Sequence, residues 1–327
     1  MRALVTGAAG FCGHHVVAHL LEKTDWEIVV LDCLNYASFG WRRLRDAGVY
    51  RDPRLHCLAT DFSKQLTPGV IQEIGDVDYI VHIGAETHVD NSVADALPFI
   101  LSNVLGTMWM LEFARTLPSL KRFIYFSTDE VFGPADHGRR FADWDRYNST
   151  NPYAASKAAG EELSLAYSNT YDIPMVITHC CNIFGERQHW EKYIPMAVRL
   201  ILAGEPVLVN ADSALTQIGS RYYLYGRHVA DALLWMLNAD LPWCEKFNIT
   251  SQREVGNLEM AEMIAMILDK NLVYKLIDPD VGRHSHDLRY DMDGTRLTVS
   301  GWSPPDDFED KLTQTVKWYA DNPDWLS

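Results

Sequence analysis

Ala3-Leu4-Val5-Thr6-Gly7-Ala8-Ala9-Gly10-Phe11-Cys12-Gly13, near the start of the chain, is the stretch that decides the fold. Its uncharged apolar beginning predicts a buried strand, and the glycines that follow predict a tight turn. Residues 14–22 then carry apolar side chains at helical spacing, and a second apolar strand, Glu27–Asp32, ends in a carboxylate. Strand, glycine-rich turn, helix and strand in this order form the βαβ unit in which a dinucleotide-binding fingerprint occurs.

The three glycines, spaced as Gly7-x-x-Gly10-x-x-Gly13, each have a separate task. The first permits the turn, the second lets the backbone approach a pyrophosphate, and the third lets the helix pack on the strand. Free N–H groups at the helix N-terminus then face the phosphates. Asp32, at the end of the second strand, can accept hydrogen bonds from both hydroxyls of the adenosine ribose and would repel a 2′-phosphate. We therefore predict a site for NAD rather than NADP.

Apolar strands continue to alternate with helical stretches as far as about residue 180. Unbroken apolar strands of this kind belong to a parallel sheet that helices cover on both faces. Strands are predicted at 54–59, 79–83, 122–127 and 175–179, and helices at 70–74, 99–115 and 153–171. The looser pattern beyond gives helices at 190–203, 228–238, 259–268 and 308–320 and a short strand at 207–209.

This order of elements predicts an α/β protein. Residues 1–180 should form a Rossmann-type doubly wound parallel sheet, and residues 181–327 a smaller mixed α/β lobe that binds substrate at the ligand edge of the sheet. Segments near 222–240 and 290–300 are expected to pack back on the first domain.

A Tyr-x-x-x-Lys pair, Tyr153 and Lys157, opens one of the predicted helices. Residues four apart share a helix face, so the ammonium group can lower the pKa of the phenol and also hold the ribose of the cofactor. A phenolate there can take the proton of a secondary alcohol while hydride leaves for nicotinamide. Ser127 and Thr128, at the tip of a predicted strand, supply hydroxyls for the same alcohol oxygen. In isolation, such a pair is more often a helix-start tyrosine and a solvated lysine.

The predicted cofactor site takes in further residues around the glycine turn. Asp61, at the end of the third strand, either contacts the adenine amino group or belongs to a surface loop. The full set comprises Gly7, Gly10, Phe11, Cys12, Gly13, Asp32, Asp61, Phe62, Ala85, Tyr153 and Lys157.

The composition excludes several classes of protein. The chain has 327 residues, 47% hydrophobic and 22% charged, which is ordinary for a globular protein with a large core. Its net charge of −15 predicts no nucleic-acid partner and requires a local basic site for any anionic ligand. No apolar run approaches the roughly 20 residues of a membrane span, and we see no apolar stretch typical of a secretion signal. We therefore expect a cytoplasmic protein with no membrane partner.

The cysteines and histidines give no sign of a metal or a disulfide framework. Six cysteines, at positions 12, 33, 57, 180, 181 and 244, contain no Cys-x-x-Cys pair, so reduced thiols are expected. His284 and His286 form a His-x-His pair without a nearby third ligand, and we expect no metal.

Three of these features together resemble the extended short-chain dehydrogenase/reductase family: the glycine turn, Ser127-Thr128 and the Tyr153-x-x-x-Lys157 pair. Ser-Thr-Asp-Glu-Val-Phe-Gly at 127–133 is more specific, because it resembles the Ser-Thr-Asp-Glu-Val-Tyr-Gly stretch of nucleotide-sugar 4,6-dehydratases, nearest to the dTDP-glucose 4,6-dehydratases. The likeness runs almost end to end and continues at Ala85–Ser92, Asn103–Thr107, Asn151–Lys157, His286–Asp293 and Gly301-Trp302.

Asp129-Glu130 is the feature that distinguishes dehydratases within this family, since the epimerases, decarboxylases and reductases usually lack the pair. The resemblance implies that C4 of a nucleotide-linked hexose is oxidised first. Glu130 then removes the proton on C5, and Asp129 protonates the departing C6 hydroxyl. The hydride returns to C6 and C5 is reprotonated, so NAD is regenerated. The implied catalytic set is Thr128, Asp129, Glu130, Tyr153 and Lys157.

The resemblance also implies residues that hold the sugar nucleotide. Arg221 and Arg283 fit two diphosphate-contacting arginines, and Asn182 fits an asparagine at the nucleotide phosphate, with a surface salt bridge or a solvated side chain as the alternative for each. The implied substrate set is completed by His88, Asn257 and His286. Departures from the family pattern at Ile183 and 216–228 fall where the base would bind, so dTDP, UDP and other nucleotides stay open.

Two other functions and one assembly also follow from the resemblance. A nucleotide-sugar 4-epimerase or decarboxylase is the main alternative, and a non-catalytic nucleotide-binding module is the other. In relatives, the helices that match 99–115 and 153–171 pair across a two-fold axis. A homodimer is therefore expected, with Trp109, Met110 and Leu163 at its interface.

Overall fold

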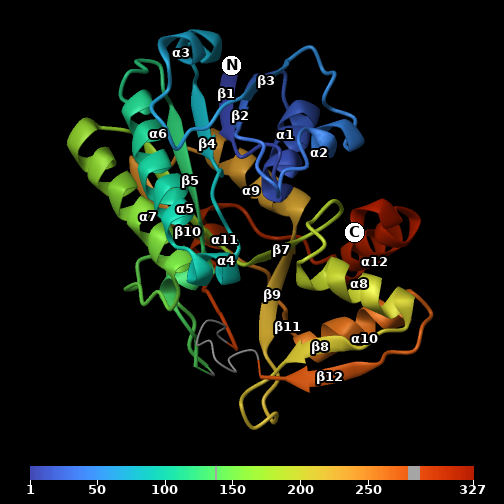
Figure 1. Ribbon diagram of the computed structural model, residues 1–327. Coiled ribbons are helices and arrows are strands. Elements are labelled where there is room, and N and C mark those ends of the chain that lie inside the picture. The colour runs from blue at the N-terminus through green and yellow to red at the C-terminus, as the bar shows by residue number, and fades with distance from the viewer. Residues whose placement is uncertain (137, 279–287) are drawn as a thin grey trace.

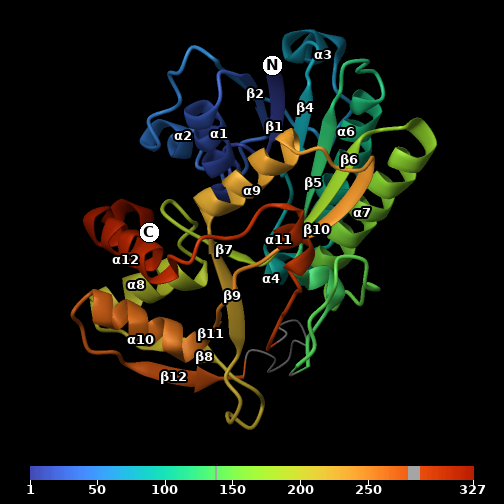
Figure 2. The ribbon, with the colours of Figure 1, turned by 180° about the vertical axis from the view of Figure 1, so that it is seen from behind.

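The computed structural model describes residues 1–136, 138–278 and 288–327. Its main body is a seven-stranded parallel sheet in the order β3-β2-β1-β4-β5-β6-β10 (Figures 1 and 2). These strands are β1 (Arg2–Thr6), β2 (Glu27–Asp32), β3 (Leu55–Ala59), β4 (Tyr79–His82), β5 (Arg122–Thr128), β6 (Met175–Cys180) and β10 (Cys244–Ile249). The order reverses between β1 and β4, as in a doubly wound sheet. The predicted Rossmann-type fold is confirmed.

Alternate residues of each strand feed two cores, one on either face of the sheet. On β1, Ala3 and Val5 join the core beneath α1 (Phe11–Lys23) and α9 (Gly226–Asn238), whereas Leu4 joins the core on the other face. That other face is covered by α6 (Thr107–Ala114) and α7 (Pro152–Tyr171) (Figure 1). Burial on both faces explains why the strands read as unbroken apolar runs.

The predicted helix at 99–115 is present but is not regular throughout. It begins as α5 (Leu97–Phe99), passes through the π-helical stretch η1 (Ile100–Gly106) and continues as α6. Within the described ranges, only Leu97–Ala114 is long and apolar enough, by length and composition, to cross a membrane, and 44% of it is buried in the molecule. Core helices of soluble proteins meet the same criterion, so the stretch is weak support for a membrane span.

The second lobe combines two small sheets with three helices around a core of its own. One sheet contains β7 (Asn182–Phe184), β9 (Ser220–Tyr225) and β11 (Glu254–Gly256), and the other contains β8 (Val207–Asn210) and β12 (Tyr274–Ile277). The helices are α8 (Tyr193–Ala203), α10 (Asn257–Ile267) and α12 (Phe308–Asp321). The lobe lies below the carboxyl ends of the main sheet in Figure 1. This is the position that a mixed α/β lobe needs in order to cover a ligand at that edge.

Short helices complete the described fold: α2 (Arg42–Asp46), α3 (Pro68–Ile74), α4 (Val89–Ala94), η2 (Asp129–Phe132), α11 (Thr295–Ser300) and η3 (Pro323–Trp325). Two late segments return to the first domain, since α9 packs on α1 and α11 packs on β10. The edge strand β10 also comes from beyond residue 180. The domain limits drawn from the sequence stay a prediction.

The strand β10 is the element that the sequence analysis missed in the main sheet. Its sequence, Cys-Glu-Lys-Phe-Asn-Ile, interrupts the apolar pattern with Glu245, Lys246 and Asn248, yet all three are buried. Each is paired by a residue far along the chain; Glu245, for example, forms an ion pair with Arg296. A periodicity argument cannot detect a strand whose buried positions are polar and satisfied from a distance.

Candidate active site

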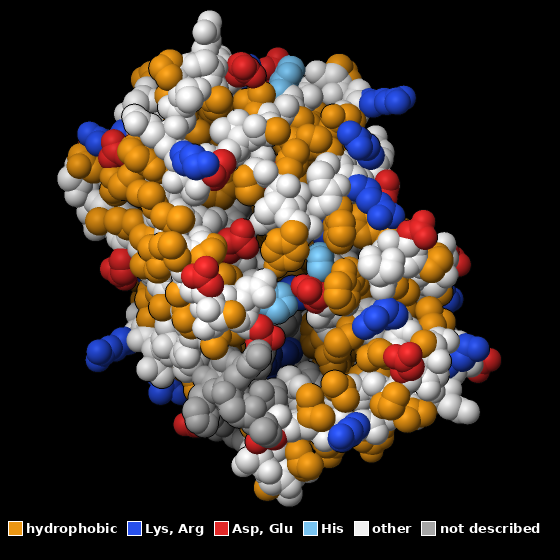
Figure 3. Space-filling view, viewed as in Figure 1, with side chains coloured by type: hydrophobic (Ala, Val, Ile, Leu, Met, Phe, Trp, Pro, Cys, Tyr) orange, Lys and Arg blue, Asp and Glu red, His pale blue; other side chains and the backbone are white. Residues whose placement is uncertain are grey.

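A cleft of about 320 Å³ lies at the carboxyl ends of the parallel strands, at the point between β1 and β4 where the strand order reverses. It is lined from both lobes: Gly10, Asp32 and Tyr153 belong to the first domain, and Asn182 and Lys192 to the second. Figure 3 shows this face hollowed near its centre, where acidic, basic and histidine side chains gather. Of the predicted site residues, the lining includes Gly7, Gly10, Phe11, Cys12, Gly13, Asp32, Phe62, Ala85, His88, Thr128, Asp129, Glu130, Tyr153, Lys157 and Asn182.

The glycine turn has no room for side chains. A Cβ atom on Gly7, whose φ is +68°, would lie 2.5 Å from Cα of Gly84. A Cβ atom on Gly13 would lie 2.1 Å from the carbonyl oxygen of Gly7, and one on Gly10 would lie 3.0 Å from the same atom. The turn therefore presents bare backbone to the cleft at the N-terminus of α1. This geometry fits a dinucleotide pyrophosphate.

Asp32 lines the cleft beside this turn and is 6% exposed. Its two carboxylate oxygens accept hydrogen bonds from the backbone N–H groups of Ala9, at 2.9 Å, and Leu34, at 2.8 Å. Burial raises the pKa of Asp32, while these two hydrogen bonds and the guanidinium of Arg43 oppose the increase. The carboxylate is thus fixed at the end of β2, where the ribose of NAD would lie.

Arg43 is a cleft residue that the sequence analysis missed. It is 1% exposed, and its Nη1 donates to the carbonyl oxygens of Ala9, Ala37 and Ser38 at 3.0, 2.7 and 3.0 Å. Its Nε donates to the carbonyl oxygen of Arg187 in the second lobe at 2.8 Å. Burial lowers the pKa of Arg43 to about 10, which leaves it charged at neutral pH. No sequence pattern marks this arginine, because only packing brings the short helix α2 against the glycine turn.

Phe62 lines the cleft, but Asp61 next to it does not. The Oδ1 atom of Asp61 accepts hydrogen bonds from the backbone N–H and the hydroxyl of Ser63, at 3.0 and 2.6 Å. Its Oδ2 atom forms an ion pair with Lys64 at 3.1 Å. The structure therefore places Asp61 in a turn next to a cleft residue, and its predicted contact with the adenine amino group stays a prediction.

The acid pair lies directly after β5. The hydroxyl of Thr128 donates to Oδ1 of Asp129 at 3.1 Å, and Nδ2 of Asn151 donates to Oε2 of Glu130 at 3.1 Å. Burial raises the pKa of Asp129 to about 7, and the charge of Glu130 adds to the increase, while Arg221 and the Thr128 hydroxyl oppose it. A carboxyl group with this pKa is partly protonated at neutral pH and can donate a proton.

Tyr153 lies in the first turn of α7 and is 8% exposed. Asn151 caps this helix, since its Oδ1 accepts a hydrogen bond from the backbone N–H of Ala154 at 2.8 Å. Burial raises the pKa of Tyr153 far above its ordinary value, the charge of Glu130 adds to the increase, and a hydrogen bond with Thr128 opposes it. Thr128 therefore links the phenol of Tyr153 to Asp129 by hydrogen bonds.

Lys157 lies one helical turn after Tyr153, and its Nζ is 4.4 Å from the centre of the Tyr125 ring. Burial lowers the pKa of Lys157 to about 7, and the carboxylate of Glu161 opposes the decrease. The expectation that Lys157 lowers the pKa of Tyr153 stays a prediction, because burial and the charge of Glu130 dominate the pKa of this phenol. The lysine is itself desolvated, so its charge is only partly held, and its head group lies against Tyr125.

Lys192 is a second cleft residue that the sequence analysis missed. Burial lowers its pKa, while Glu130, Glu191 and Asp90 raise it, so the ammonium group lies among carboxylates near the acid pair. Lys192 immediately precedes α8, which begins at Tyr193 rather than at the predicted residue 190. An acidic protein that binds an anionic ligand needs a local cation, and this requirement could have pointed to Lys192 in the sequence. On the same wall, Nε2 of His88 lies 3.6 Å from Oε2 of Glu191.

Arg221 and Asn257 lie in the second lobe and are not among the residues that line the cleft. The Nη1 atom of Arg221 donates to the carbonyl oxygen of Leu288 at 2.6 Å, and its guanidinium lies 4.7 Å from the centre of the Tyr290 ring. Its charge still lowers the pKa of Asp129, so it lies near the acid pair. Asn257 begins α10 and is mostly buried. The other predicted substrate residues, Arg283 and His286, are outside the described residues.

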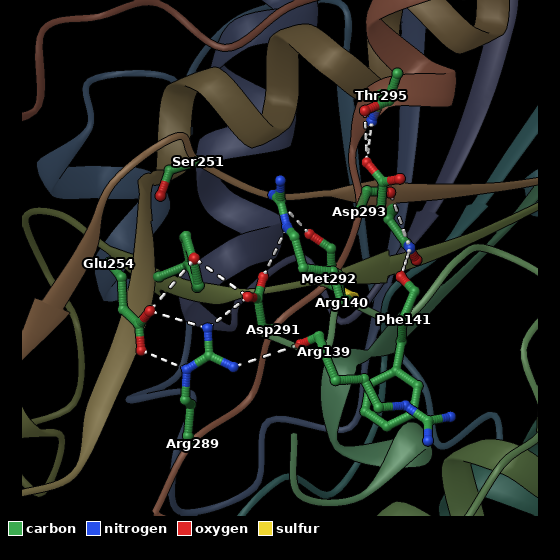
Figure 4. A network of polar contacts seen from close by, with 12 residues as sticks. Arg139, Arg140, Phe141, Ser251, Glu254, Arg289, Asp291, Met292, Asp293 and Thr295 are labelled. Carbon is green, nitrogen blue, oxygen red and sulfur yellow. Dashed lines mark hydrogen bonds and ion pairs between the residues drawn. The ribbon is translucent and has the colours of Figure 1, made fainter. Parts of the chain in front are cut away.

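An ionic network surrounds Arg289 (Figure 4). Arg289 follows Leu288, whose carbonyl oxygen accepts the hydrogen bond from Arg221. Arg289 donates to both carboxylate oxygens of Glu254, at 2.7 and 3.0 Å, and to Asp291 at 2.5 Å. The Nε atom of Arg140 donates to the other oxygen of Asp291 at 3.2 Å. A bidentate arginine–carboxylate pair fixes geometry as well as charge. The network therefore joins β11, the chain after residue 287 and the loop that carries Arg140.

The described cysteines and acidic residues form no metal centre. All six cysteines are free thiols. Within residues 1–136, 138–278 and 288–327, no group of three or more His, Cys, Asp or Glu side chains could hold a metal ion. The predicted His-x-His pair, His284 and His286, lies outside these ranges.

Known proteins share both the sequence and the fold. A dTDP-glucose 4,6-dehydratase of Neisseria gonorrhoeae is 35% identical over 98% of this chain and 95% of its own length. The trifunctional UDP-glucose 4,6-dehydratase/UDP-4-keto-6-deoxy-D-glucose 3,5-epimerase/UDP-4-keto-L-rhamnose-reductase RHM2 of Arabidopsis thaliana is 32% identical over 98% of this chain. This chain spans about half of that relative, 47% of its length.

Solved structures of nucleotide-sugar dehydratases also share the fold of this chain. The crystal structure of DesIV, a dTDP-glucose 4,6-dehydratase of Streptomyces venezuelae with NAD bound, is 35% identical, with a TM-score of 0.88 over 100% of this chain and 99% of that one. The model of the NAD dependent epimerase/dehydratase family matches residues 3–250. Because this match covers most of the chain, the protein belongs to the NAD dependent epimerase/dehydratase family.

Proposed function

We propose that the protein is an NAD-dependent nucleotide-sugar 4,6-dehydratase, a hydro-lyase. Its substrate is a nucleotide-diphosphate glucose of the dTDP or UDP type, and its product is the 4-keto-6-deoxy sugar. The observation that carries this proposal is the position of Asp129 and Glu130 in the same cleft as Tyr153 and the glycine turn. The resemblance to dehydratases along the whole chain supports it.

The cofactor that fits the cleft is NAD. The bare glycine turn would hold its pyrophosphate, Asp32 its adenosine ribose, and Lys157 the ribose next to nicotinamide. Bound NAD supplies the hydride acceptor for oxidation at C4 and the hydride donor for reduction at C6.

Tyr153 and its neighbours act at C4 of the hexose. The phenolate of Tyr153 takes the proton of the C4 hydroxyl, and the Thr128 hydroxyl, which hydrogen-bonds the phenol, orients the same oxygen. A phenolate is costly at this buried site, so a nearby positive charge is needed to stabilise it. Lys157 is the cation on the same helix face that can supply this charge.

Asp129 and Glu130 act at C6 and C5. The new C4 carbonyl acidifies the C5 proton, Glu130 removes it, and Asp129 protonates the C6 hydroxyl as water departs. Glu130 later returns its proton to C5. One turnover therefore leaves Tyr153 with one proton more and Asp129 with one fewer. Thr128 hydrogen-bonds both side chains, so its hydroxyl lies where this proton can return.

The sugar nucleotide needs cations in a chain of net charge −15. Lys192 lines the cleft beside Glu130, and Arg221 lies behind it in the second lobe. We assign the diphosphate to these two side chains, with Asn182 and His88 on the same wall and Asn257 nearby. Arg283 and His286 stay predicted substrate residues.

The test is incubation of the purified protein with dTDP-, UDP-, GDP- and CDP-hexoses, followed by the masses of the products. A product lighter by one water supports the dehydratase. A new compound of unchanged mass, separated from the substrate by chromatography, identifies a 4-epimerase, and loss of carbon dioxide from a UDP-hexuronate identifies a decarboxylase. With Glu130→Gln, solvent deuterium should enter C5 about 10²–10⁴ times more slowly, because the base for C5 is lost. Exchange at the wild-type rate would contradict the assignment of Glu130.

We also propose a homodimer formed by Leu97–Ala114 and α7. Leu97, Ile100 and Leu101 are 61, 45 and 42% exposed, an apolar surface that a second copy would cover. Trp109 and Leu163 are half-buried, as an interface allows. Met110 was wrongly expected at the interface, because it is fully buried in the core. Light scattering at micromolar concentration should give twice the chain mass; a monomer mass would contradict the dimer.

A cytoplasmic location is part of the same proposal. Six free cysteines fit a reducing compartment, and the substrate and NAD belong to intermediary metabolism. Fractionation of the native host should recover the activity with cytoplasmic markers.

A further inference from the structure

A row of polar side chains crosses the main sheet beneath α7. Ser127 of β5 lies beside His179 of β6 in the strand register, and His179 lies beside Asn248 of β10. Ser127 is 3% exposed and the other two are fully buried. Three register neighbours on one face of a sheet place their side chains in a line. This buried line needs a partner, because unpaired polar groups are costly there.

Glu161 of α7 is that partner, and it is fully buried. One carboxylate oxygen, Oε1, accepts a hydrogen bond from the hydroxyl of Ser127. The other, Oε2, accepts one from the hydroxyl of Tyr147 and lies 3.0 Å from Nε2 of His179. The Nζ atom of Lys246, from β10, lies 3.6 Å from the same oxygen and donates to Tyr147. Four elements thus converge on one carboxylate.

The hydrogen bonds also fix the orientation of the His179 ring. The Nδ2 atom of Asn248 donates to the carbonyl oxygens of Phe141 and Asp293, at 2.9 and 3.1 Å, so its Oδ1 atom faces His179. This oxygen lies 2.9 Å from Nδ1 of His179, while Nε2 faces Glu161. Both ring nitrogens of His179 therefore face acceptor oxygens. His179, Lys246 and Ser127 lower the pKa of Glu161 against the opposing effect of burial, so this carboxylate is an anion.

Glu161 is also coupled to the catalytic residues. It follows Lys157 by four residues on α7, and residues at this spacing share a helix face. Its carboxylate opposes the loss of the proton from Lys157, so it raises the pKa of that lysine. Its hydrogen bond to Ser127 holds the end of β5 one residue before Thr128.

We propose that Glu161 is a positioning residue of the reaction, which keeps Lys157 as an ammonium ion and fixes the strand end that carries Thr128, Asp129 and Glu130. This inference rests on the proposed function, because it gives Lys157 a task only if C4 is oxidised. The titratable and charged groups that face Glu161 or its partners include Lys157 and Glu162 on α7, His82 on β4, Tyr125 on β5, His179 on β6, Lys246 on β10, and Asp143 and Tyr147 on the preceding loop.

The experiment measures reduction of bound nicotinamide in the first turnover, between about pH 5.5 and 9. Asp129 and Glu130 do not enter this step, so its pH dependence reports on Lys157 and Tyr153. With the wild type, the rate should rise with pH as the phenol ionises and should level off above about pH 7, where Lys157 loses its proton. With Glu161→Gln the rate should level off at least one pH unit lower, which makes reduction about tenfold slower on the plateau above pH 7. Glu161→Asp should restore most of the wild-type profile.

Lys246→Met is the matched variant with the opposite expectation. It removes a cation from beside Glu161, so the field of Glu161 at Lys157 becomes stronger and the pH at which the rate levels off should move higher. If Glu161→Gln does not fold, the direction of this shift still decides the proposal. A loss of rate by the same factor at every pH, or a shift of Lys246→Met to lower pH, would overturn it. Absence of a product lighter by one water would instead overturn the dehydratase, since nicotinamide reduction precedes water loss.

Discussion

Asp129 and Glu161 are two buried carboxyl groups in the same domain, 7% and 0% exposed. Their neighbours shift the two pKa values in opposite directions. Asp129 has a hydroxyl and a second carboxylate beside it, and its pKa is raised to about 7 by burial and by Glu130. Burial also opposes ionisation of Glu161, but His179, Lys246 and Ser127 outweigh it, and the pKa is lowered. The comparison shows that counter-ions, rather than depth, decide whether a buried carboxyl group is a proton donor or a permanent charge.

Asp129→Asn should produce the largest effect. The amide keeps the shape but cannot donate the proton to the C6 hydroxyl, so product formation should slow by about 10²–10⁴-fold. Oxidation at C4 should continue, and the absorbance of reduced nicotinamide should build up and persist. The exposed Asp306→Asn serves as the control and should turn over normally. Equal slowing of oxidation and product formation would show that Asp129 is not specific to elimination.

Glu161→Gln should lower stability, because it leaves Lys246 and His179 without their anion. Removal of one partner of a buried ion pair costs about 3–5 kcal/mol of unfolding free energy. Urea unfolding at pH 7 measures this loss. Glu162→Gln, at an exposed position next in the chain, should change stability by no more than about 0.5 kcal/mol. If the two variants were equally stable, the row beneath α7 would not be held by charge.

The pH dependence of water loss should distinguish the two carboxyl groups directly. Elimination needs the acid form of Asp129, whose fraction falls about tenfold for each pH unit above its pKa of about 7. Glu161, with a lowered pKa, stays ionised over this whole range. The measurement is the decay of reduced nicotinamide after a rapid first oxidation, followed from pH 6 to 9. A rate that is constant over this range would mean that Asp129 is not the donor.

The smallest effect should be a gain in stability from Asp129→Asn. The pKa of Asp129 is raised on folding, so the native state binds its proton more tightly, and stability falls as the pH rises from about 4 through 7. Replacing the carboxyl group removes this loss. The melting temperature should therefore rise by about 1–4 °C at pH 8 and by less at pH 5. A decrease at pH 8 would show that the carboxylate has a stabilising partner.

Local patterns in the sequence indicated residues that the fold brings together in one cleft. The glycine turn, Asp32, the acid pair and the Tyr153–Lys157 spacing are each contained in one short segment and its neighbour, and all of these residues line the cleft. The sequence analysis did not identify Arg43 and Lys192 as site residues, because each reaches the cleft through packing between segments that are far apart in the chain. The same limit produced the wrong expectation for Met110, whose burial depends on which helix face meets the sheet.

The sequence by itself determined the order of strands and helices as far as about residue 180, the βαβ turn and the kinds of chemical group at its edge, because each rests on a period of two or about 3.6 residues or on a glycine that a turn requires. Only the tertiary structure decided which buried carboxyl groups are protonated. Asp129 is a weak acid because burial and the charge of Glu130 outweigh the effect of Arg221, and Glu161 is an anion because β6 and β10 bring His179 and Lys246 to it. Those partners lie 18 and 85 residues away along the chain, and a pKa depends on distance in space rather than on distance in sequence.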